Sequence, residues 1–148
     1  MIWTLLFILI KHGTIKVINI VIPCKNEGIT INQTLSLLNF QNGINGVKVI
    51  VADSSDDGTT YHLENRNRDY FNLDIIQGGL PSKARNKGAE RATTPFILFM
   101  DADMMILDTN LLQECMEMMR RERLDLLTTK VRTTNGKYNY VFRRKWLK

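Results

Sequence analysis

The sequence of 148 residues lacks several features that would place it in common classes of protein. It has only two cysteines, Cys24 and Cys115, which lie far apart and outside any C-x-x-C pattern. Neither a disulfide framework nor a zinc site is therefore predicted, and a reducing, cytoplasmic location suits the chain. No G-x-G-x-x-G follows a predicted strand and no G-x-x-x-x-G-K-[ST] is present, which argues against dinucleotide-binding and P-loop enzymes.

The sequence also lacks an apolar run long enough to cross a bilayer, which needs about 20 residues. Its first ten residues, M-I-W-T-L-L-F-I-L-I, are strongly apolar but end at Lys11. They have neither the basic start nor the small-residue cleavage site of a secretory signal. We treat residues 1–16 as an apolar segment ahead of a domain spanning residues 17–148. Two roles stay open for this segment: contact with a membrane surface, or packing on the domain.

Most of the chain has no excess of charge of either sign. The net charge of +5 is accounted for by residues 136–148, which contain five basic residues and no acid. Because the remainder is close to neutral, no nucleic-acid partner is predicted. The basic residues could form a solvated tail, or could attract the chain to the cytoplasmic face of an acidic membrane as a peripheral protein.

Apolar runs alternate with amphipathic stretches along the chain. Strands are predicted over residues 17–22, 47–53, 73–77, 96–100, 124–131 and 137–142. Helices are predicted over residues 27–40, 59–69, 83–92 and after 108–109. We expect Pro23 to end the first strand, Ser82 to cap the third helix, and Asp108 or Thr109 to cap the fourth. The alternation predicts one α/β domain with a mainly parallel sheet covered on both faces.

Four carboxylates follow predicted strands: Glu27, Asp53, Asp101 and Asp103. In an open α/β sheet, ligands bind beyond the carboxyl ends of the strands, so we expect these side chains at one edge. Carboxylates gathered there repel one another unless a cation or hydrogen-bond donors lie between them. Hard oxygen ligands suit Mg²⁺ or Mn²⁺, although a D-x-D pattern by itself is more often an ordinary loop or a helix cap.

A glycine-rich turn with basic residues precedes the fourth predicted strand. The segment 78–88, G-G-L-P-S-K-A-R-N-K-G, places Lys83, Arg85 and Lys87 near a helix start. The amide groups and the dipole at a helix start favour anions. The alternative interpretation is a turn followed by a solvated basic helix face.

Taken together, these residues resemble family 2 glycosyltransferases of the GT-A fold, over residues 17–103. The segment 21–27, V-I-P-C-K-N-E, is similar to the family's V-I-P-x-x-N-E, and 51–59, V-A-D-S-S-D-D-G-T, to its D-D-x-S-x-D-G-T. The segment 84–88, A-R-N-K-G, resembles A-R-N-x-G, and 99–103, F-M-D-A-D, resembles F-L-D-A-D. Four such motifs in order imply a three-layer, Rossmann-like domain that binds nucleoside-diphosphate sugars.

The resemblance implies roles for residues in the first two motifs. Pro23 and Glu27, with Asn26 beside them, would line the nucleoside pocket. Asp53 would read the base, typically uracil. The chain departs from the family pattern at Ala52, where the family has the first aspartate of the loop. The second position, Asp53, is the one that usually contacts the nucleotide.

The resemblance also implies roles at the other end of the donor. Arg85 would lie near the nucleotide or its phosphates, and Asp101 would approach the ribose. Asp103, together with Asp101, would hold the Mn²⁺ or Mg²⁺ ion that bridges the diphosphate.

The motifs that complete such an enzyme are missing. Inverting members of the family use a carboxylate as general base, commonly in an acidic E-D motif well after the D-x-D. Here 45 residues follow Asp103, no acid follows Asp125, and no Gln-x-x-Arg-Trp is present. The donor half is therefore recognisable, the acceptor half is largely absent, and the catalytic base is unknown. A sheet edge left open by the absent half would favour a homodimer.

Two functional hypotheses follow. The first is a hexosyltransferase that moves a sugar from a nucleoside diphosphate, expected to be a UDP-sugar, to a saccharide or lipid-linked acceptor. The second is a non-catalytic nucleotide-sugar-binding module, or an inactive fragment of such an enzyme. A sugar-phosphate nucleotidyltransferase is disfavoured, because residues 23–28 do not form the glycine-rich phosphate loop that it requires after the first strand.

Overall fold

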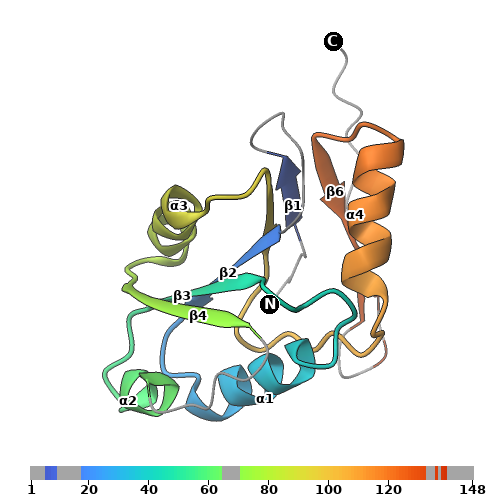
Figure 1. Ribbon diagram of the computed structural model, residues 1–148. Coiled ribbons are helices and arrows are strands. Elements are labelled where there is room, and N and C mark those ends of the chain that lie inside the picture. The colour runs from blue at the N-terminus through green and yellow to red at the C-terminus, as the bar shows by residue number, and fades with distance from the viewer. Residues whose placement is uncertain (1–5, 10–17, 65–70, 133–135, 137, 140–148) are drawn as a thin grey trace.

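The computed structural model of the chain describes residues 6–9, 18–64, 71–132, 136 and 138–139 (Figure 1). Its helices are α1 Gly28–Leu38, α2 Thr59–Glu64, α3 Pro81–Arg91 and α4 Leu111–Arg121. Its strands are β1 Leu6–Leu9, β2 Ile18–Cys24, β3 Lys48–Asp53, β4 Asn72–Gln77, β5 Phe96–Phe99, β6 Leu126–Thr128, β7 Val131–Arg132 and β8 Tyr138–Asn139. From β2 to α4 strands and helices alternate, as the sequence predicts.

Six strands form one sheet in the order β4-β3-β2-β5-β1-β6, while β7 pairs with β8. The four strands β4, β3, β2 and β5 are parallel, and β1 runs antiparallel to both β5 and β6. Asp53 lies in register with Cys24 on one side and with Gln77 on the other. Three neighbouring strands therefore end level, and the loops that follow them begin at the same edge.

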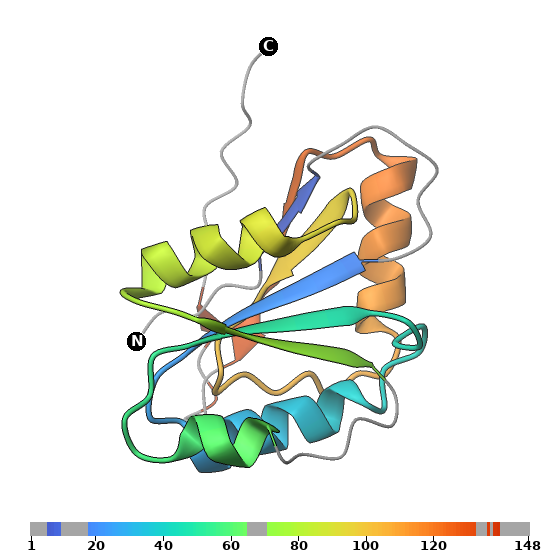
Figure 2. The same cartoon turned by 60° about the vertical axis from the view of Figure 1, so that its left-hand side comes forward.

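Helices cover both faces of the sheet, which gives the predicted three layers (Figure 2). Helix α3 covers one face, and α1, α2 and α4 cover the other. Side chains of β2 alternate between the two sides. Ile20 and Ile22 belong to the large core on the side of α1 and α4, whereas Val21 packs with Ala89 and Ala92 on the side of α3.

Pro23 lies inside β2, so the predicted end of this strand at residue 22 is wrong. The neighbouring strand β5 pairs with β2 only as far as Val21, so beyond that residue β2 has one pairing partner, β3. A proline cannot donate to a ladder and is tolerated where a strand has a free side. Pro23 pairs in register with Ala52, and the strand continues to Cys24.

Two helices begin differently from the prediction. Leu80 is the N-cap of α3 and Pro81 its first residue, so Ser82 lies within the helix and makes no side-chain cap. Proline suits this position because its fixed φ matches the helix and its missing N–H is not needed there. The N-cap of α4 is Asn110, and the Asp108 carboxylate accepts a 2.9 Å hydrogen bond from the Asn110 N–H instead.

The predicted strand over residues 124–131 is divided into β6 and β7. The chain leaves α4 at Arg123, whose φ of 51° is left-handed, and the Leu124 N–H donates to the Met119 carbonyl at 2.9 Å. This helix end uses residues that the apolar pattern assigned to a strand. Of the predicted strand over 137–142, the described part is β8, and residues 65–69 of the predicted second helix lie outside the described residues.

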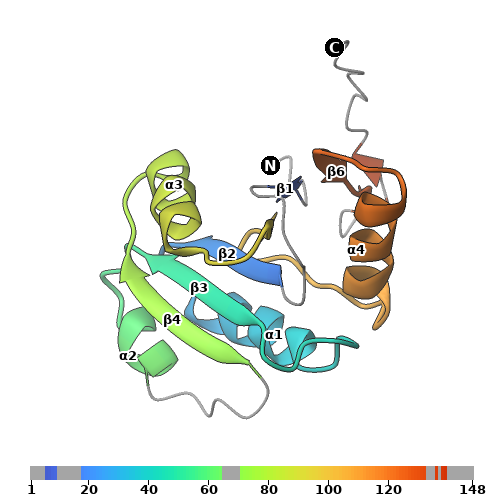
Figure 3. The ribbon, with the colours of Figure 1, turned by 45° about the horizontal axis from the view of Figure 1, so that its top comes forward.

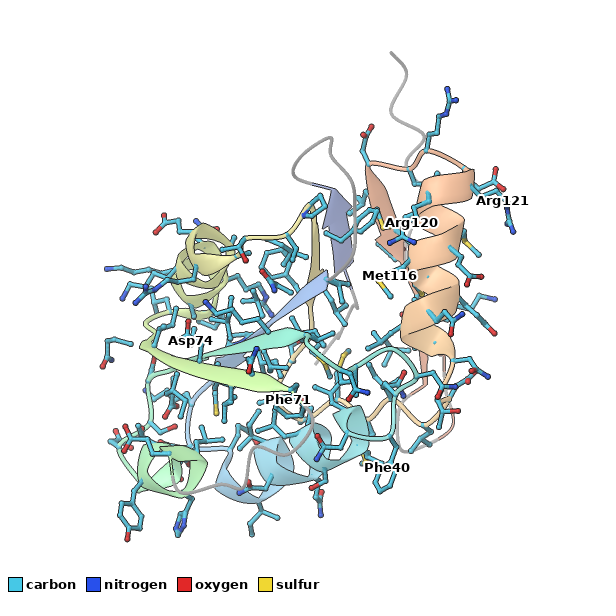
Figure 4. The ribbon with its side chains drawn as sticks, in the orientation of Figure 1. Phe40, Phe71, Asp74, Met116, Arg120 and Arg121 are labelled. Carbon is cyan, nitrogen blue, oxygen red and sulfur yellow. The ribbon has the colours of Figure 1, made fainter. Side chains whose placement is uncertain are left out.

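Helix α4 packs its apolar side against the sheet, away from the loops at the ends of the parallel strands (Figures 1 and 4). Met116 and Arg120 point toward the strands, whereas Arg121 points away from them (Figure 4). The Arg120 guanidinium lies 5.9 Å from the centre of the Phe96 ring, which is within the range of a cation–π contact.

Part of the apolar N-terminal segment lies in the sheet. Leu6 pairs with Phe99 and Leu9 with Phe96, which places β1 between β5 and β6 (Figure 3). For residues 6–9 the structure favours packing on the domain, and the boundary at residue 16 stays a prediction. The rest of this segment and the basic residues 143–148 lie outside the described residues. None of the described helices has the length and apolar character needed to cross a membrane.

Gly88 provides a test of the contact between α3 and the sheet. A Cβ atom added at Gly88 would overlap the side chain of Val21 in β2. We expect Gly88→Ala to lower the free energy of unfolding by about 2 kcal/mol, because overpacking a close contact outweighs the gain in helix propensity. Urea denaturation measures this change. The control is Asn86→Ala, exposed on the same helix, and a Gly88→Ala variant as stable as this control would contradict the close contact.

Candidate functional site

A pocket of about 390 Å³ opens at the edge where β2, β3 and β5 end. Its walls come from the loops after these strands and from the β4–α3 loop, and Figure 2 shows these loops at one end of the sheet. We call it the central pocket, and it is lined by Pro23, Cys24, Lys25, Glu27, Ser54, Gly79, Leu80, Pro81, Arg85, Asp101, Ala102 and Asp103. The sequence thus locates most of its charged residues, while Asn26 lies in the β2–α1 loop and Asp53 is the last residue of β3, both outside the lining.

Asp101 follows β5 closely and is buried, with 7% of its surface exposed. Arg85, in the second turn of α3, forms an ion pair with Asp101 through Nη2 and Oδ1. Burial raises the pKa of Asp101, while the positive charge of Arg85 and its hydrogen bond act to lower that pKa. The ion pair supplies the partner that a buried carboxylate requires.

Asp103 is in a different electrostatic environment from Asp101. Asp103 is exposed, and no described lysine or arginine forms an ion pair with it. Partial burial raises the pKa of Asp103 most, and the negative charges of Glu27 and Asp101 raise it further. Glu27 itself accepts a hydrogen bond from the Thr30 hydroxyl at 2.5 Å. This side of the central pocket therefore has an excess of negative charge.

The residues of the pocket fit a divalent cation that is shared with a ligand. Asp101 and Asp103 offer hard oxygen atoms, the donors that Mg²⁺ and Mn²⁺ prefer. Within the described part of the chain, no group of three or more His, Cys, Asp or Glu residues could hold a metal ion. Mg²⁺ is commonly bound by one or two carboxylates together with substrate phosphates. A cation held jointly with a phosphate ligand fits these residues better than one held by the protein alone.

The carboxylate of Asp53 forms hydrogen bonds within its own loop. It is 4% exposed, and its Oδ1 accepts from the N–H and the hydroxyl of Ser55 at 3.1 and 2.5 Å. Its Oδ2 accepts from the Thr60 hydroxyl. Ser54, one residue further on, lines the central pocket together with Lys25 and Leu80. Sequence reasoning gave these three residues no role, and their only signal was their place inside the quoted segments 21–27, 51–59 and 78–88.

Asn26 joins the β2–α1 loop to the β3–α2 loop. Its side chain donates to the Asp56 carboxylate at 2.8 Å and accepts from the Asp56 N–H at 3.0 Å. Its own N–H donates to the Ser55 hydroxyl at 2.8 Å. Asn26 has a left-handed φ of 56°, a conformation that asparagine tolerates better than most residues. The residue thus fixes two loops beside the pocket relative to each other.

The β4–α3 loop is attached to the end of β3. The Gly79 N–H donates to the Ser54 hydroxyl at 2.5 Å, and a Cβ atom at Gly78 would lie 2.7 Å from the Ala52 carbonyl oxygen. The Lys87 ammonium donates to the Gly78 carbonyl at 2.8 Å, so it binds this loop rather than pointing free into the pocket. Only glycine allows so close an approach of the loop to β3.

Asn26 also allows a test of its left-handed backbone conformation. Asn26→Ala and Asn26→Gly both remove the hydrogen bonds to Asp56, but only alanine is disfavoured at a φ of 56°. We expect the alanine variant to unfold with a free energy about 1 kcal/mol lower than the glycine variant. Urea denaturation of the alanine and glycine variants measures this difference in the free energy of unfolding. At Asn86, within α3, the order should reverse because glycine is the poorer helix former, and the same order at both positions would contradict the left-handed conformation.

Comparison with known proteins identifies the family. The family model described as Glycosyl transferase family 2 matches residues 19–147, which include all the residues lining the central pocket. No curated protein matches the sequence.

Solved structures share the fold. TarS from S. aureus is 26% identical, with a TM-score of 0.59, over 72% of this chain and 20% of TarS. TarS 1–349 in complex with UDP is 25% identical, with a TM-score of 0.59, over 72% of this chain and 32% of that one. The mannosyltransferase PcManGT from Pyrobaculum calidifontis, in complex with GDP-Man and Mn²⁺, is 20% identical, with a TM-score of 0.58, over 75% of this chain and 34% of that one. At this identity, the similarity to PcManGT shows a shared fold and nothing more.

The chain therefore spans between 20% and 34% of the length of these structures. Their likeness confirms the predicted α/β architecture of the GT-A type. The match over residues 19–147, together with the pocket at the ends of the parallel strands, shows that this chain belongs to glycosyltransferase family 2.

Proposed function

We propose that the chain binds a nucleoside-diphosphate sugar and serves as the donor side of a hexosyltransferase that acts on a saccharide or lipid-linked acceptor. The observation that carries this proposal is the central pocket, in which the carboxylates of Asp101 and Asp103 lie with the guanidinium of Arg85 at the ends of the parallel strands. This arrangement offers oxygen ligands for a cation and a positive charge for phosphate within one space.

The diphosphate is proposed to lie between Arg85 and the two aspartates. A guanidinium binds phosphate oxygens through paired N–H donors, so Arg85 suits this position. Asp103, with Asp101, would hold Mn²⁺ or Mg²⁺ against the diphosphate. Such an ion offsets the negative charge that develops on the departing nucleoside diphosphate.

The nucleoside is proposed to lie over the ends of β2 and β3, against Pro23 and Glu27. Asp53 Oδ2 accepts only the Thr60 hydroxyl among the described hydrogen bonds, so it retains a lone pair for an N–H of the base. Asn26 supports the same surface by joining the two loops. TarS 1–349 has been crystallised with UDP and with UDP-GlcNAc at 25% identity, which supports uridine as the nucleoside.

Transfer needs more than this pocket. The acceptor oxygen must be held in line with the anomeric carbon, and a base must take its proton. No residue of the described chain is assigned to either task. The alternative of a nucleotide-sugar-binding module without turnover therefore stands beside the enzyme, and measuring hydrolysis or transfer of a bound UDP-sugar separates the two. Cytoplasmic location, contact with a membrane surface and a homodimer stay predictions.

Calorimetric titration of UDP and UDP-sugars into the purified chain, with Mn²⁺ and then with EDTA, tests donor binding. We expect metal-dependent binding in the micromolar range, roughly −8 kcal/mol. Asp103→Asn should weaken binding mainly in the presence of Mn²⁺, because it removes a metal ligand. Asp53→Asn should weaken it equally with Mn²⁺ and with EDTA, because it acts on the base and its loop.

Asp125→Asn makes the same chemical change at an exposed position before β6 and serves as the control. If neither UDP nor any UDP-sugar binds under either condition, the proposed donor site is wrong. If Asp103→Asn and Asp53→Asn have equal effects that do not depend on metal, the donor site stands but the separate roles of the two residues do not.

A further inference from the structure

Asp101 and Asp103 differ in whether a positively charged side chain lies beside them. The Asp101 side chain is 10% exposed and is paired with Arg85, whose side chain is 34% exposed. Asp103 is exposed, forms no described ion pair, and lies in the negative potential of Glu27 and Asp101. Before any ligand binds, one carboxylate therefore has a cation beside it and the other does not.

In the proposed function the single guanidinium of Arg85 has two anionic partners, Asp101 and the diphosphate, which compete for its positive charge. The ion pair commits Arg85 to Asp101, yet the proposed function requires the same guanidinium for the diphosphate. A divalent cation that uses Asp101 also competes with Arg85, because two positive charges beside one carboxylate repel each other. Metal binding and the ion pair thus oppose each other as long as no phosphate draws Arg85 away.

We propose that Arg85 is a positioning residue that couples metal binding to donor binding. In the free chain Arg85 holds Asp101 and keeps the affinity for a divalent cation low. When the diphosphate binds, the guanidinium bonds phosphate oxygens, and the Asp101 carboxylate becomes available to the cation or the ribose. The two ligands then favour each other's binding by the same factor, as linkage requires. This inference rests on the proposed donor site and adds the order in which its charges are exchanged.

The structure supports this exchange in two further ways. Within the described residues, the protein offers no cage of three ligands that would hold a metal ion without the donor. Arg85 also lies in the second turn of α3, just beyond Leu80 and Pro81 on the pocket wall, so its long side chain reaches the pocket from a fixed helix. The proposed exchange is a change of the Arg85 side-chain rotamer.

The test measures Mn²⁺ binding without nucleotide, by the loss of the electron paramagnetic resonance signal of free Mn²⁺ at pH 8. We expect Arg85→Gln to raise the affinity for Mn²⁺ alone by about tenfold, because it removes a competing positive charge from Asp101. The same variant should bind UDP more weakly than the wild type. A residue that only contacts phosphate would weaken UDP binding and leave the affinity for Mn²⁺ alone unchanged.

Lys25→Gln is the matched control. Lys25 lines the same pocket, carries the same charge and forms no described ion pair with a carboxylate. It should raise the affinity for Mn²⁺ alone by no more than about twofold, as expected of a screened surface charge. An equal effect of Lys25→Gln and Arg85→Gln would overturn the proposal, because the total charge of the pocket would then explain both. An unchanged Mn²⁺ affinity in Arg85→Gln would overturn it as well.

Two outcomes are kept apart by design. If the wild type binds no UDP with or without Mn²⁺, the proposed donor site is wrong. If UDP binds but the variants and the wild type have the same affinity for Mn²⁺ alone, only the coupling by Arg85 is wrong. Removing Arg85 leaves Asp101 buried without a partner, so a thermal melt accompanies each variant. If Arg85→Gln does not fold, Arg85→Met, which removes the charge but keeps a long side chain suited to a helix, should bind Mn²⁺ alone more tightly than the wild type. Equal affinity in that variant would overturn the proposal.

Discussion

The parallel register of β2, β3 and β4 is the constraint on which the site depends. Because Cys24, Asp53 and Gln77 lie side by side, the three strands end level. The Ser54 N–H donates to the Cys24 carbonyl at 3.0 Å, and the Gly78 N–H to the Asp53 carbonyl at 2.7 Å, so the ladder continues one residue past the strands. The loops therefore leave the sheet already fixed to one another. Binding residues on such loops need little further ordering when a ligand arrives.

The chemistry of the pocket then follows from how charge is distributed over this fixed framework. The carboxylates at this edge differ in burial and in the partners that they have, and a buried one needs a partner most. Asp53 is satisfied by neutral donors of its own loop, and Glu27 accepts from Thr30. Asp101 has a guanidinium, while Asp103 is left with its negative neighbours. Asp103 thus has no described ion pair, and the proposed function places the cation beside it.

The sequence was sufficient to predict the architecture and most of the charged residues that line the central pocket. Both follow from patterns that are local to one strand and the loop after it. Buried β-branched runs locate β2 and β3, and a carboxylate that ends such a run falls at the edge of the sheet. Contacts between loops could not be predicted in the same way. The bond from Asn26 to Asp56 joins residues 30 apart, and the ion pair of Arg85 with Asp101 joins residues 16 apart on different elements. Pro23 misled the prediction because its strand has a free side only where β5 stops.

The residues proposed to bind the donor come from one continuous part of the chain. Every residue lining the central pocket lies between Pro23 and Asp103, and the helices and strands that carry them cover each other's faces within that range. Helix α4 and the edge strand β6 lie on the side of β5 and β1, away from the pocket. The proposed donor site therefore lies wholly within residues 23–103. In the proposed function the acceptor must still be held in line with the bound sugar, so its identity can vary without a change in the donor pocket.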